Sequence, residues 1–308
     1  MTVSKRMTMQ LGAAVILVSA FACARAEPEV DMAAYEQEIL DWRADRLAHL
    51  VAPDGYLTQI GLHWVAEGRY TIGSAPENDI VAPATAAPVI GEFRVTADGV
   101  RLLVGDGVEV LQDGHPVDDL VLGADTSSHP VTVSHRSLAF SVIERAGKLA
   151  VRIRDYERPF VKDFGPIPYY DIDPGLRVTA TLKPYDEPRT VAVDTVIEGF
   201  QQFPLAPGVA VFELGGQAYE LEPTLSPDGL FFVFGDLTNR DDTYGAGRFL
   251  DTELPGDDGR LVLDFNKSYS PPCAFNDFST CPVASLKNRL RIRIEAGEKY
   301  DPALHDAS

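Results

Sequence analysis

The residues best suited to bind a ligand gather in the C-terminal third of this 308-residue chain. Arg248 offers a planar guanidinium fork that binds carboxylates or phosphates, and Tyr244 lies nearby as a wall or a hydrogen-bond partner. Asp264 and Asn266 stand two positions apart in an expected strand over 261–266, which places both side chains on one face. We therefore predict a ligand site centred on Arg248 and built with these residues, for a small molecule that carries an anionic or strongly accepting group.

Structural roles for the same residues stay open at this point. Asp264 or another acid can satisfy the fork of Arg248 completely, which leaves a buried ion pair and no site. Asp264 and Asn266 can equally hold the loop that contains Cys273 by buried hydrogen bonds, and 236–248 can be an acidic loop that satisfies its own turns. Three aspartates share the hard oxygen ligands that calcium prefers, at spacings that match no EF-hand loop: Asp236, Asp241 and Asp242.

No sequence motif identifies a catalytic centre, a cofactor or a metal. The chain lacks the serine-hydrolase elbow, the zinc-protease helix, the phosphate-binding loop and a dinucleotide fingerprint. Its six histidines show no metal-ligand spacing. His63 beside Trp64 is interpreted as a hydrogen-bonded histidine at a strand edge rather than a catalytic base. We expect neither a cofactor nor a metal.

The N-terminus predicts export. A basic start precedes an apolar run over 11–22, which is too short to span a bilayer and fits a signal peptide over 1–26. One processing alternative is cleavage after the A-x-A site 24–26. The other is lipidation at Cys23, which would be the protein's only attachment to a membrane. Either alternative makes the protein periplasmic or exported, and its oligomeric state stays open.

Export bears on the other two cysteines. Cys273 and Cys281 stand eight positions apart in a proline-bounded loop, and thiols oxidise outside the cytoplasm. The spacing exceeds that of a zinc knuckle. The nearest titratable groups are acids, which raise rather than lower a thiol pKa and so disfavour a nucleophile. We predict a disulfide between them.

The overall charge excludes some partners. Asp and Glu number 46 against 27 Lys and Arg, a formal net charge of −19. Nucleic acids and anionic lipids attract basic surfaces, so neither is expected as a partner. Hydrophobic residues make up 45% of the chain, which is typical of a globular protein rather than a disordered one.

A single long helix is expected in the N-terminal segment 27–50. Asp31 can cap a helix over 32–50, whose apolar residues recur at near-helical spacing. These apolar positions are Tyr35, Ile39, Leu40, Trp42, Leu47 and Leu50. The helix is amphipathic, so we expect it to pack against a sheet.

After this helix the hydrophobic period becomes two. Alternating runs over 138–143 and 149–153 flank a turn, the runs 210–214 and 219–221 flank another, and 290–295 alternates near the end. This pattern predicts an all-β fold with one N-terminal amphipathic helix.

We expect the strands to form two antiparallel β-sandwich or barrel-like regions. The first runs over 51–158 and the second, which carries the candidate site, over 175–299. The segment 159–174 interrupts the strand rhythm and is the best candidate boundary.

The first β region resembles a forkhead-associated β-sandwich. The similarity rests on 70–74, 78–81, 113–117 and 120–123, but Ser74 stands where the phosphate-binding arginine of that family belongs. The resemblance implies a sandwich topology without phosphopeptide binding.

A second resemblance covers most of the chain, from about 41 to 299. The segments that carry it are 54–57, 61–64, 242–250, 263–267, 271–275, 280–282, 288–290 and 295–299. They resemble the bacterial and archaeal domain of unknown function 1684, which implies no established activity. Val283-Ala284-Ser285 departs from the prolines usual there.

We predict an exported β-rich protein that binds a small anionic or polar molecule. The pocket is expected from 236–298, together with the Tyr169-Tyr170 segment. One alternative is a periplasmic hydrolase that uses residues of 236–298. Another is a structural or interaction protein of the cell envelope.

Overall fold

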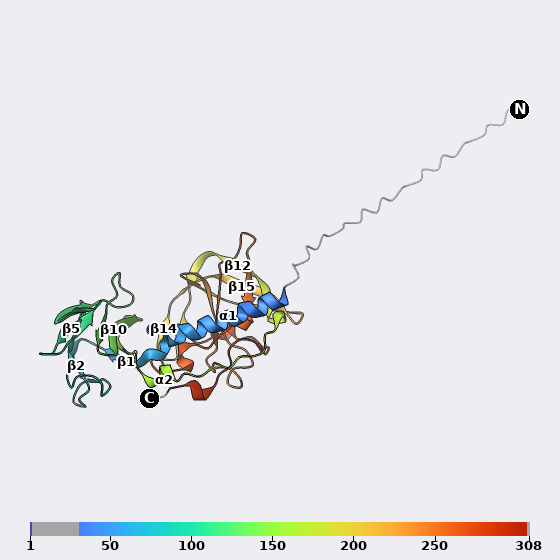
Figure 1. The fold of residues 1–308 in the computed structure, drawn as a ribbon. Helices are drawn as coiled ribbons and strands as arrows, with labels where there is room; N and C mark the ends of the chain where they lie inside the picture. Colours follow the sequence, from blue (N-terminus) through green and yellow to red (C-terminus); the bar gives the residue numbers. More distant parts are fainter. Residues whose placement is uncertain (2–30, 307–308) are drawn as a thin grey trace.

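The computed structural model of the protein describes residue 1 and residues 31–306. The predicted signal peptide and Cys23 lie outside this part of the chain. Within the described residues no helix has the length and apolarity needed to cross a membrane. The protein is all-β with one long N-terminal helix, as predicted, and Figure 1 shows its two β regions side by side.

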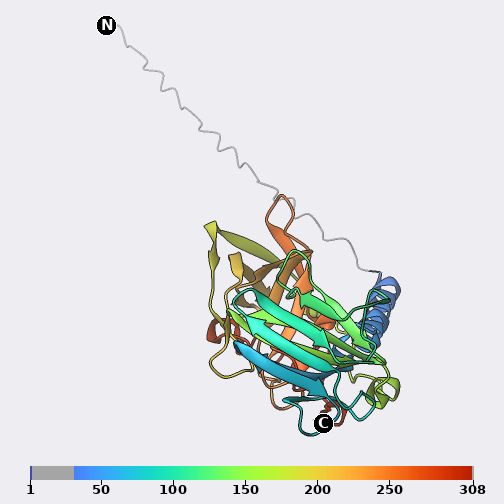
Figure 2. The same ribbon diagram turned by 90° about the vertical axis from the view of Figure 1, so that its left-hand side faces the viewer.

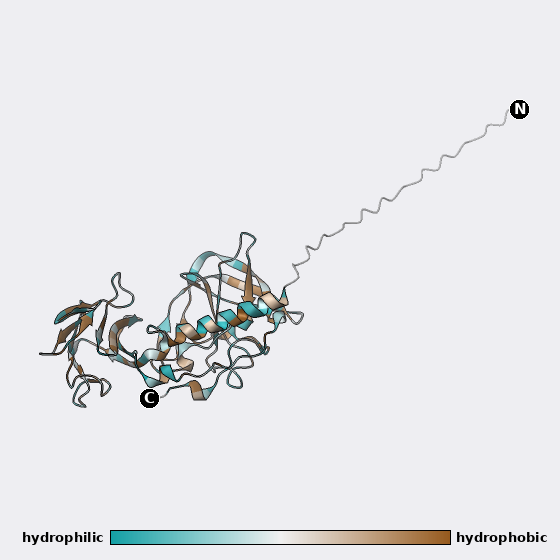
Figure 3. Ribbon diagram, viewed as in Figure 1, coloured by the Kyte–Doolittle hydropathy of each residue, from teal (hydrophilic) through white to brown (hydrophobic). Residues whose placement is uncertain are grey.

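The helix α1 (Met32–Val51) lies along the second β region (Figure 1). The carboxylate of Asp31 caps it by accepting hydrogen bonds from the backbone N–H groups of Ala33 and Ala34. Hydrophilic and hydrophobic residues are interspersed along it (Figure 3). Ile39 is fully buried, whereas Leu40 is 50% exposed. Leu40 therefore lies outside the buried face, because adjacent helical residues point about 100° apart.

The first β region is a sandwich of two sheets, drawn nearest the viewer in Figure 2. One sheet has the order β1-β11-β10-β9-β6-β7, with strands β1 (Gln59–Val65), β6 (Leu111–Gln112), β7 (His115–Pro116), β9 (Thr132–His135), β10 (Leu138–Arg145) and β11 (Lys148–Asp155). The other has the order β3-β2-β4-β5-β8, with strands β2 (Gly68–Gly73), β3 (Ile80–Val81), β4 (Gly91–Thr96), β5 (Gly99–Val104) and β8 (Asp119–Leu122). Apolar side chains such as Ile72, Phe93 and Phe140 fill the space between the sheets.

The second β region has its own core. A four-stranded sheet in the order β16-β15-β12-β20 contains β12 (Arg177–Thr190), β15 (Leu205–Leu214), β16 (Gln217–Leu221) and β20 (Arg260–Asp264). A three-stranded sheet contains β17 (Thr224–Ser226), β18 (Gly229–Phe234) and β19 (Arg248–Thr252), and β13 (Val193–Asp194) pairs with β14 (Gln201–Gln202). Phe212, Phe232, Phe234 and Phe265 contribute the largest side chains of this core.

The predicted hairpins are present, and two other strand predictions needed correction. β10 pairs with β11 and β15 with β16, as the alternation indicated. The strand expected over 261–266 ends at Asp264, where the 3-10 helix η3 (Phe265–Lys267) begins. The run 290–295, expected as a strand, joins no sheet of the described chain. Its backbone makes hydrogen bonds to residues 235–237 at isolated positions, and these do not form a ladder.

Short elements connect the two β regions. The candidate boundary 159–174 begins with the short helix α2 (Pro159–Lys162) and is followed by η2 (Pro174–Leu176). Buried Arg158 donates to the carbonyls of Leu57 and Gln59 and pairs with Asp306. The ring centroids of Trp64 and Phe200 lie 4.5 Å apart across the seam between the regions.

His63 lies in the edge strand β1, as predicted, but its ring makes no hydrogen bond to any residue that the structure describes. Burial lowers the pKa of His63 below its ordinary value of 6.5. Below pH 6.5 the unfolded chain therefore binds more protons at this position than the folded chain, and the free energy of unfolding falls as the pH falls.

We expect the wild type to lose more stability between pH 7.5 and pH 5 than His63→Gln. Urea unfolding at several pH values measures this difference. His129→Gln is the control, because His129 is exposed. Parallel pH profiles for the wild type and His63→Gln would contradict the assignment.

Candidate binding site

Arg248 lies at the start of β19 and is completely buried. Its Nη2 donates to Asp236 Oδ2 at 2.8 Å and to the carbonyl of Ile294 at 2.8 Å, and its Nη1 donates to the carbonyl of Ala296. The side chain of Asp236 is also completely buried at this ion pair. The buried ion pair that the sequence left open is therefore present, and its acid is Asp236, from the loop directly after β18, rather than Asp264.

Asp264 and Asn266 do lie together, at the N-terminal end of α1. The hydroxyl of Tyr35 donates to the carboxylate of Asp264 at 2.9 Å and accepts from Nδ2 of Asn266 at 2.9 Å. Nδ2 of Asn266 also donates to the carbonyl of Asp173 at 2.8 Å. Burial, reinforced by the charge of Asp264, raises the pKa of Tyr35. This network ties α1 and the 173 turn to the end of β20, rather than holding the loop of Cys273.

Removing the hydroxyl of Tyr35 tests this anchoring role. Tyr35→Phe should lower the free energy of unfolding by about 1–3 kcal/mol, because it takes a hydrogen-bond donor away from the buried carboxylate of Asp264. Tyr156→Phe, at an exposed tyrosine, is the matched control and should stay within about 0.5 kcal/mol. Urea unfolding measures both. Equal effects of the two substitutions would show that the network contributes nothing specific.

Tyr244, the fourth predicted site residue, lies elsewhere. Its ring packs edge-on against Tyr300 at 5.3 Å, in the small apolar cluster under α1 that also contains Phe275. Hydrogen bonds therefore unite only two of the four predicted residues, Asp264 and Asn266. The predicted site does not assemble around Arg248.

The three aspartates of the acidic loop 236–248 are all paired with arginines. Asp236 pairs with Arg248, while Asp241 and Asp242 both pair with Arg293. The three aspartates considered for calcium are thus divided between two arginines. Among the described residues no group of three or more candidate ligands is placed to hold a metal ion.

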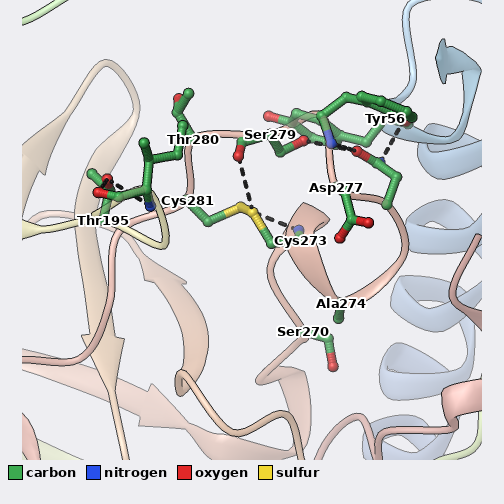
Figure 4. Close-up of a disulfide and its surroundings, with 12 residues drawn as sticks. Tyr56, Thr195, Ser270, Cys273, Ala274, Asp277, Ser279, Thr280 and Cys281 are labelled. Atoms are coloured by element: carbon green, nitrogen blue, oxygen red, sulfur yellow. Dashed lines mark hydrogen bonds between the residues drawn. A yellow bond between two sulfur atoms is a disulfide. The ribbon is translucent and has the colours of Figure 1, made fainter. Parts of the chain in front are cut away.

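The predicted disulfide between Cys273 and Cys281 is confirmed, with Cα atoms 6.2 Å apart. Figure 4 shows it closing the loop beside Ser279 and Asp277. Both cysteines are 5% exposed and pack with Phe249. The disulfide thus fixes a loop that begins next to Pro272, in the wall of a cavity.

This cavity of about 510 Å³ lies between α1 and the three-stranded sheet. It is lined from four places: α1, the turn after it, strands β18 and β19, and the loop 269–272. The lining residues are Trp42, Asp45, Arg46, His49, Tyr56, Phe231, Phe249, Asp251, Tyr269 and Pro272. We call it the α1 cavity. None of the four predicted ligand-binding residues lines it.

Aromatic rings form most of its wall. The centroids of Trp42 and Tyr269 lie 6.3 Å apart, and Phe249 meets Tyr269 edge-on at 5.7 Å. Phe231 meets Phe249 edge-on at 4.8 Å. Arranged in this way, the rings offer apolar faces to a ligand and hold one another in place.

Arg46, which lines the cavity, is neutralised by an acid of the protein. Arg46 Nε donates to Glu298 Oε1 at 2.9 Å, and Glu298 is completely buried. Nη2 of Arg46 donates to the carbonyl of Ser270 at 2.9 Å. The guanidinium carbon of Arg46 lies 4.5 Å from the ring centroid of Tyr269. Glu298 Oε2 accepts from the backbone N–H of Ser270 at 2.7 Å. The charge of Arg46 is therefore balanced within the protein.

Unengaged hydrogen-bond acceptors lie at the cavity, beside the indole N–H of Trp42 and the hydroxyl of Tyr56, which make no hydrogen bond to a described residue either. His49 Nδ1 lies 2.7 Å from the carbonyl of Asp45, which can only accept, so the neutral ring keeps Nε2 as an acceptor. Asp251 Oδ2 accepts from the hydroxyl of Tyr269 at 2.6 Å, which leaves Oδ1. Partial burial raises the pKa of Asp251. The Asp45 carboxylate has no hydrogen-bond partner among the described residues.

The helix sequence carries a signal for this cavity, although the four predicted site residues lie outside it. Trp42, Asp45, Arg46 and His49 follow the i, i+3, i+4 and i+7 spacing that places residues on one helix face. Such a polar and aromatic face on a helix that packs against a sheet indicates a site at their junction.

A second, wider hollow of about 970 Å³ lies between β13–β14, β17 and residues 282–289. Two of its charged residues, Arg189 and Glu222, are already paired at 2.6 Å. The α1 cavity, with its unengaged acceptors, is therefore the stronger candidate.

Comparisons with known proteins identify a family over part of the chain. Residues 162–299 match the family described as protein of unknown function (DUF1684). The resemblance noted from the sequence is thereby confirmed there, and the match does not extend to the first β region. No curated protein matches the chain.

Two solved structures are similar over parts of the chain. The solution NMR structure of an uncharacterized protein of Haloarcula marismortui is 30% identical and covers 46% of this chain and 80% of that one, with a TM-score of 0.38. The cytoplasmic domain of the T3SS sorting platform protein PscD from P. aeruginosa is 26% identical and covers 32% of this chain and 80% of that one, with a TM-score of 0.21. Neither similarity carries an argument about function.

Proposed function

For this chain, which belongs to the DUF1684 family over residues 162–299, we propose that the α1 cavity binds a small molecule with an apolar face and several hydrogen-bond donors. The observation that carries the proposal is the combination of aromatic walls with unengaged acceptors at Asp45, His49 and Asp251. Hydroxyl and amine groups are donors that such acceptors bind, and flat ring faces pack on aromatic rings.

This ligand class replaces the predicted anion. The anion prediction depended on a free guanidinium at Arg248, which is instead paired with Asp236. At the α1 cavity the charge of Arg46 is balanced by Glu298, while Asp45 and Asp251 add negative charge. A carboxylate or phosphate would be repelled there, whereas a neutral polyol or an amine would not.

The proposed cellular setting is the periplasm or the exterior. The support is the predicted signal peptide over 1–26, together with the disulfide between Cys273 and Cys281. A small-molecule binding protein in this setting needs no cofactor and no catalytic group.

Titration calorimetry with glucose, N-acetylglucosamine and tyramine tests the proposal, with acetate as the anionic arm. We expect binding in at least one of the first three arms, which separates sugars from amines, and none with acetate. Asp251→Asn should weaken that binding about tenfold or more, because a charge-assisted hydrogen bond is lost. Asp228→Asn is the matched control, since Asp228 is an exposed neighbour of Asp251 that does not line the cavity.

Two outcomes would contradict the proposal. One is the absence of binding in all three donor-bearing arms. The other is equal affinity of Asp251→Asn and Asp228→Asn for the ligand that does bind, which would place the ligand outside the α1 cavity.

A further inference from the structure

Arg152 is an arginine without an acceptor. It lies in β11, and its Nε is buried and makes no hydrogen bond to any residue that the structure describes. No hydrogen bond or ion pair joins the rest of its guanidinium to a described residue either. Arg152 is partly buried, and a buried N–H without a partner is costly, because it loses water and gains nothing in return.

The charges around Arg152 make this cost larger. Arg154 follows on the same face of β11 and is occupied by the carbonyl of Gly55 and the hydroxyl of Thr58. Arg145, at the hairpin end, is occupied by Asp125 at 2.7 Å. Burial, followed by repulsion from Arg154 and Arg145, lowers the pKa of Arg152 to about 10. Arg152 is therefore the one of these three arginines that no described acceptor engages.

A second orphaned donor lies on the same face of this sheet. Gln59 is completely buried, and its Nε2 has no hydrogen-bond partner among the described residues. Gln59 stands directly opposite Arg154 in the β1–β11 register, so its side chain emerges on the same face as Arg152 and Arg154. Its Oε1 accepts from the hydroxyl of Ser279 at 2.9 Å, which shows that this face is turned toward the second β region.

The face is a seam rather than open surface. Val151 and Ile153 alternate with the arginines and point into the core of the first region. Trp64 stands opposite Ala150, on the arginine side of the sheet, and packs there on Phe200 of the second region. A ligand held at Arg152 is therefore partly enclosed, where a hydrogen-bonded ion pair is stronger than in water.

We propose that the seam between the two β regions holds a small oxyanion, a phosphate or a carboxylate, bound by the guanidinium of Arg152 with Nε2 of Gln59 as a further donor. The site is separate from the α1 cavity and takes the opposite chemistry. Arg152 supplies a planar fork that matches two oxygens of such a group. The seam site does not depend on ligand binding in the α1 cavity, and either can be absent without the other.

Thermal unfolding in sodium phosphate, compared with sodium chloride at equal ionic strength and pH 7, provides the test. Phosphate should raise the melting temperature of the wild type by about 2–4 °C above that in chloride. Arg152→Met should abolish that difference. Arg101→Met is the control for the general salting effect of phosphate, because Arg101 is exposed on the other sheet and already paired with Asp119. It should keep the wild-type difference.

A second variant gives Arg152 an acceptor from the protein itself. Ser141 stands directly opposite Arg152 on β10, so Ser141→Asp places a carboxylate beside the guanidinium. It should melt higher than the wild type in chloride and gain nothing from phosphate. Acetate in place of phosphate separates a carboxylate site from a phosphate-specific one. The proposal is overturned if the wild type melts equally in phosphate and chloride, or if Arg152→Met and Ser141→Asp both retain the wild-type difference.

Discussion

Asp236→Asn should destabilise the protein by about 3–5 kcal/mol, a larger loss than we expect from any of the other substitutions. The side chains of both partners in the Asp236–Arg248 pair are completely buried. In the variant, the Oδ1 position can still accept from the backbone N–H of Thr238, which turns an amide NH₂ toward Nη2 of Arg248. Two donors then face each other around an unpaired buried charge.

Urea unfolding measures this loss, and the exposed acid Asp241 provides the control. Asp241 pairs with Arg293 at the surface, so Asp241→Asn should change the free energy of unfolding by less than about 1 kcal/mol. A loss below about 1 kcal/mol for Asp236→Asn would mean that Arg248 finds another acceptor, and that its role in the fold is replaceable.

Removing the disulfide should lower the free energy of unfolding by about 2–3 kcal/mol, through the entropy that the unfolded loop regains. The double variant Cys273→Ala and Cys281→Ala isolates this effect, because both cysteines are buried and alanine leaves no polar group behind. The loop follows Tyr269 and Pro272 in the wall of the α1 cavity, so ligand binding there should weaken as well.

The measurement is urea unfolding of the wild type and the double variant, each with and without reductant. Reductant should destabilise the wild type and leave the double variant unchanged. Labelling of the denatured, unreduced protein should find no free thiol at Cys273 or Cys281. Two reactive thiols at these positions would contradict the disulfide.

Local pattern was sufficient for much of the architecture. The alternation over 138–143 and 149–153 predicts the β10–β11 hairpin, because period two and a turn are properties of neighbouring residues. Asp31 predicts the start of α1 for the same reason. The run 290–295 shows the limit: its alternation is equally regular, yet no described strand pairs along it, since pairing requires a partner from another part of the chain.

The candidate sites show a different limit. The sequence marks Arg248 as the centre of either a ligand site or a buried ion pair. Which of the two forms depends on whether an acid faces the guanidinium in the fold. Asp236 is nearer in sequence than Asp264, and the turn after β18 brings it within 2.8 Å. The orphaned Arg152 carries no mark in the sequence, since its neighbours Arg154 and Ser141 look like ordinary polar positions of strands.

The sequence by itself determined the disulfide pair, the single long helix and the all-β pattern, because each depends on residues that are close together along the chain. The export signal, which is equally local, stays a prediction. Only the tertiary structure decided where charge is balanced and where it is not. Arg46 meets Glu298 across the chain, Arg248 meets Asp236, and Arg152 meets no acid among the described residues. Electrostatic interactions and burial depend on distance in space, and the fold sets those distances through contacts between remote segments.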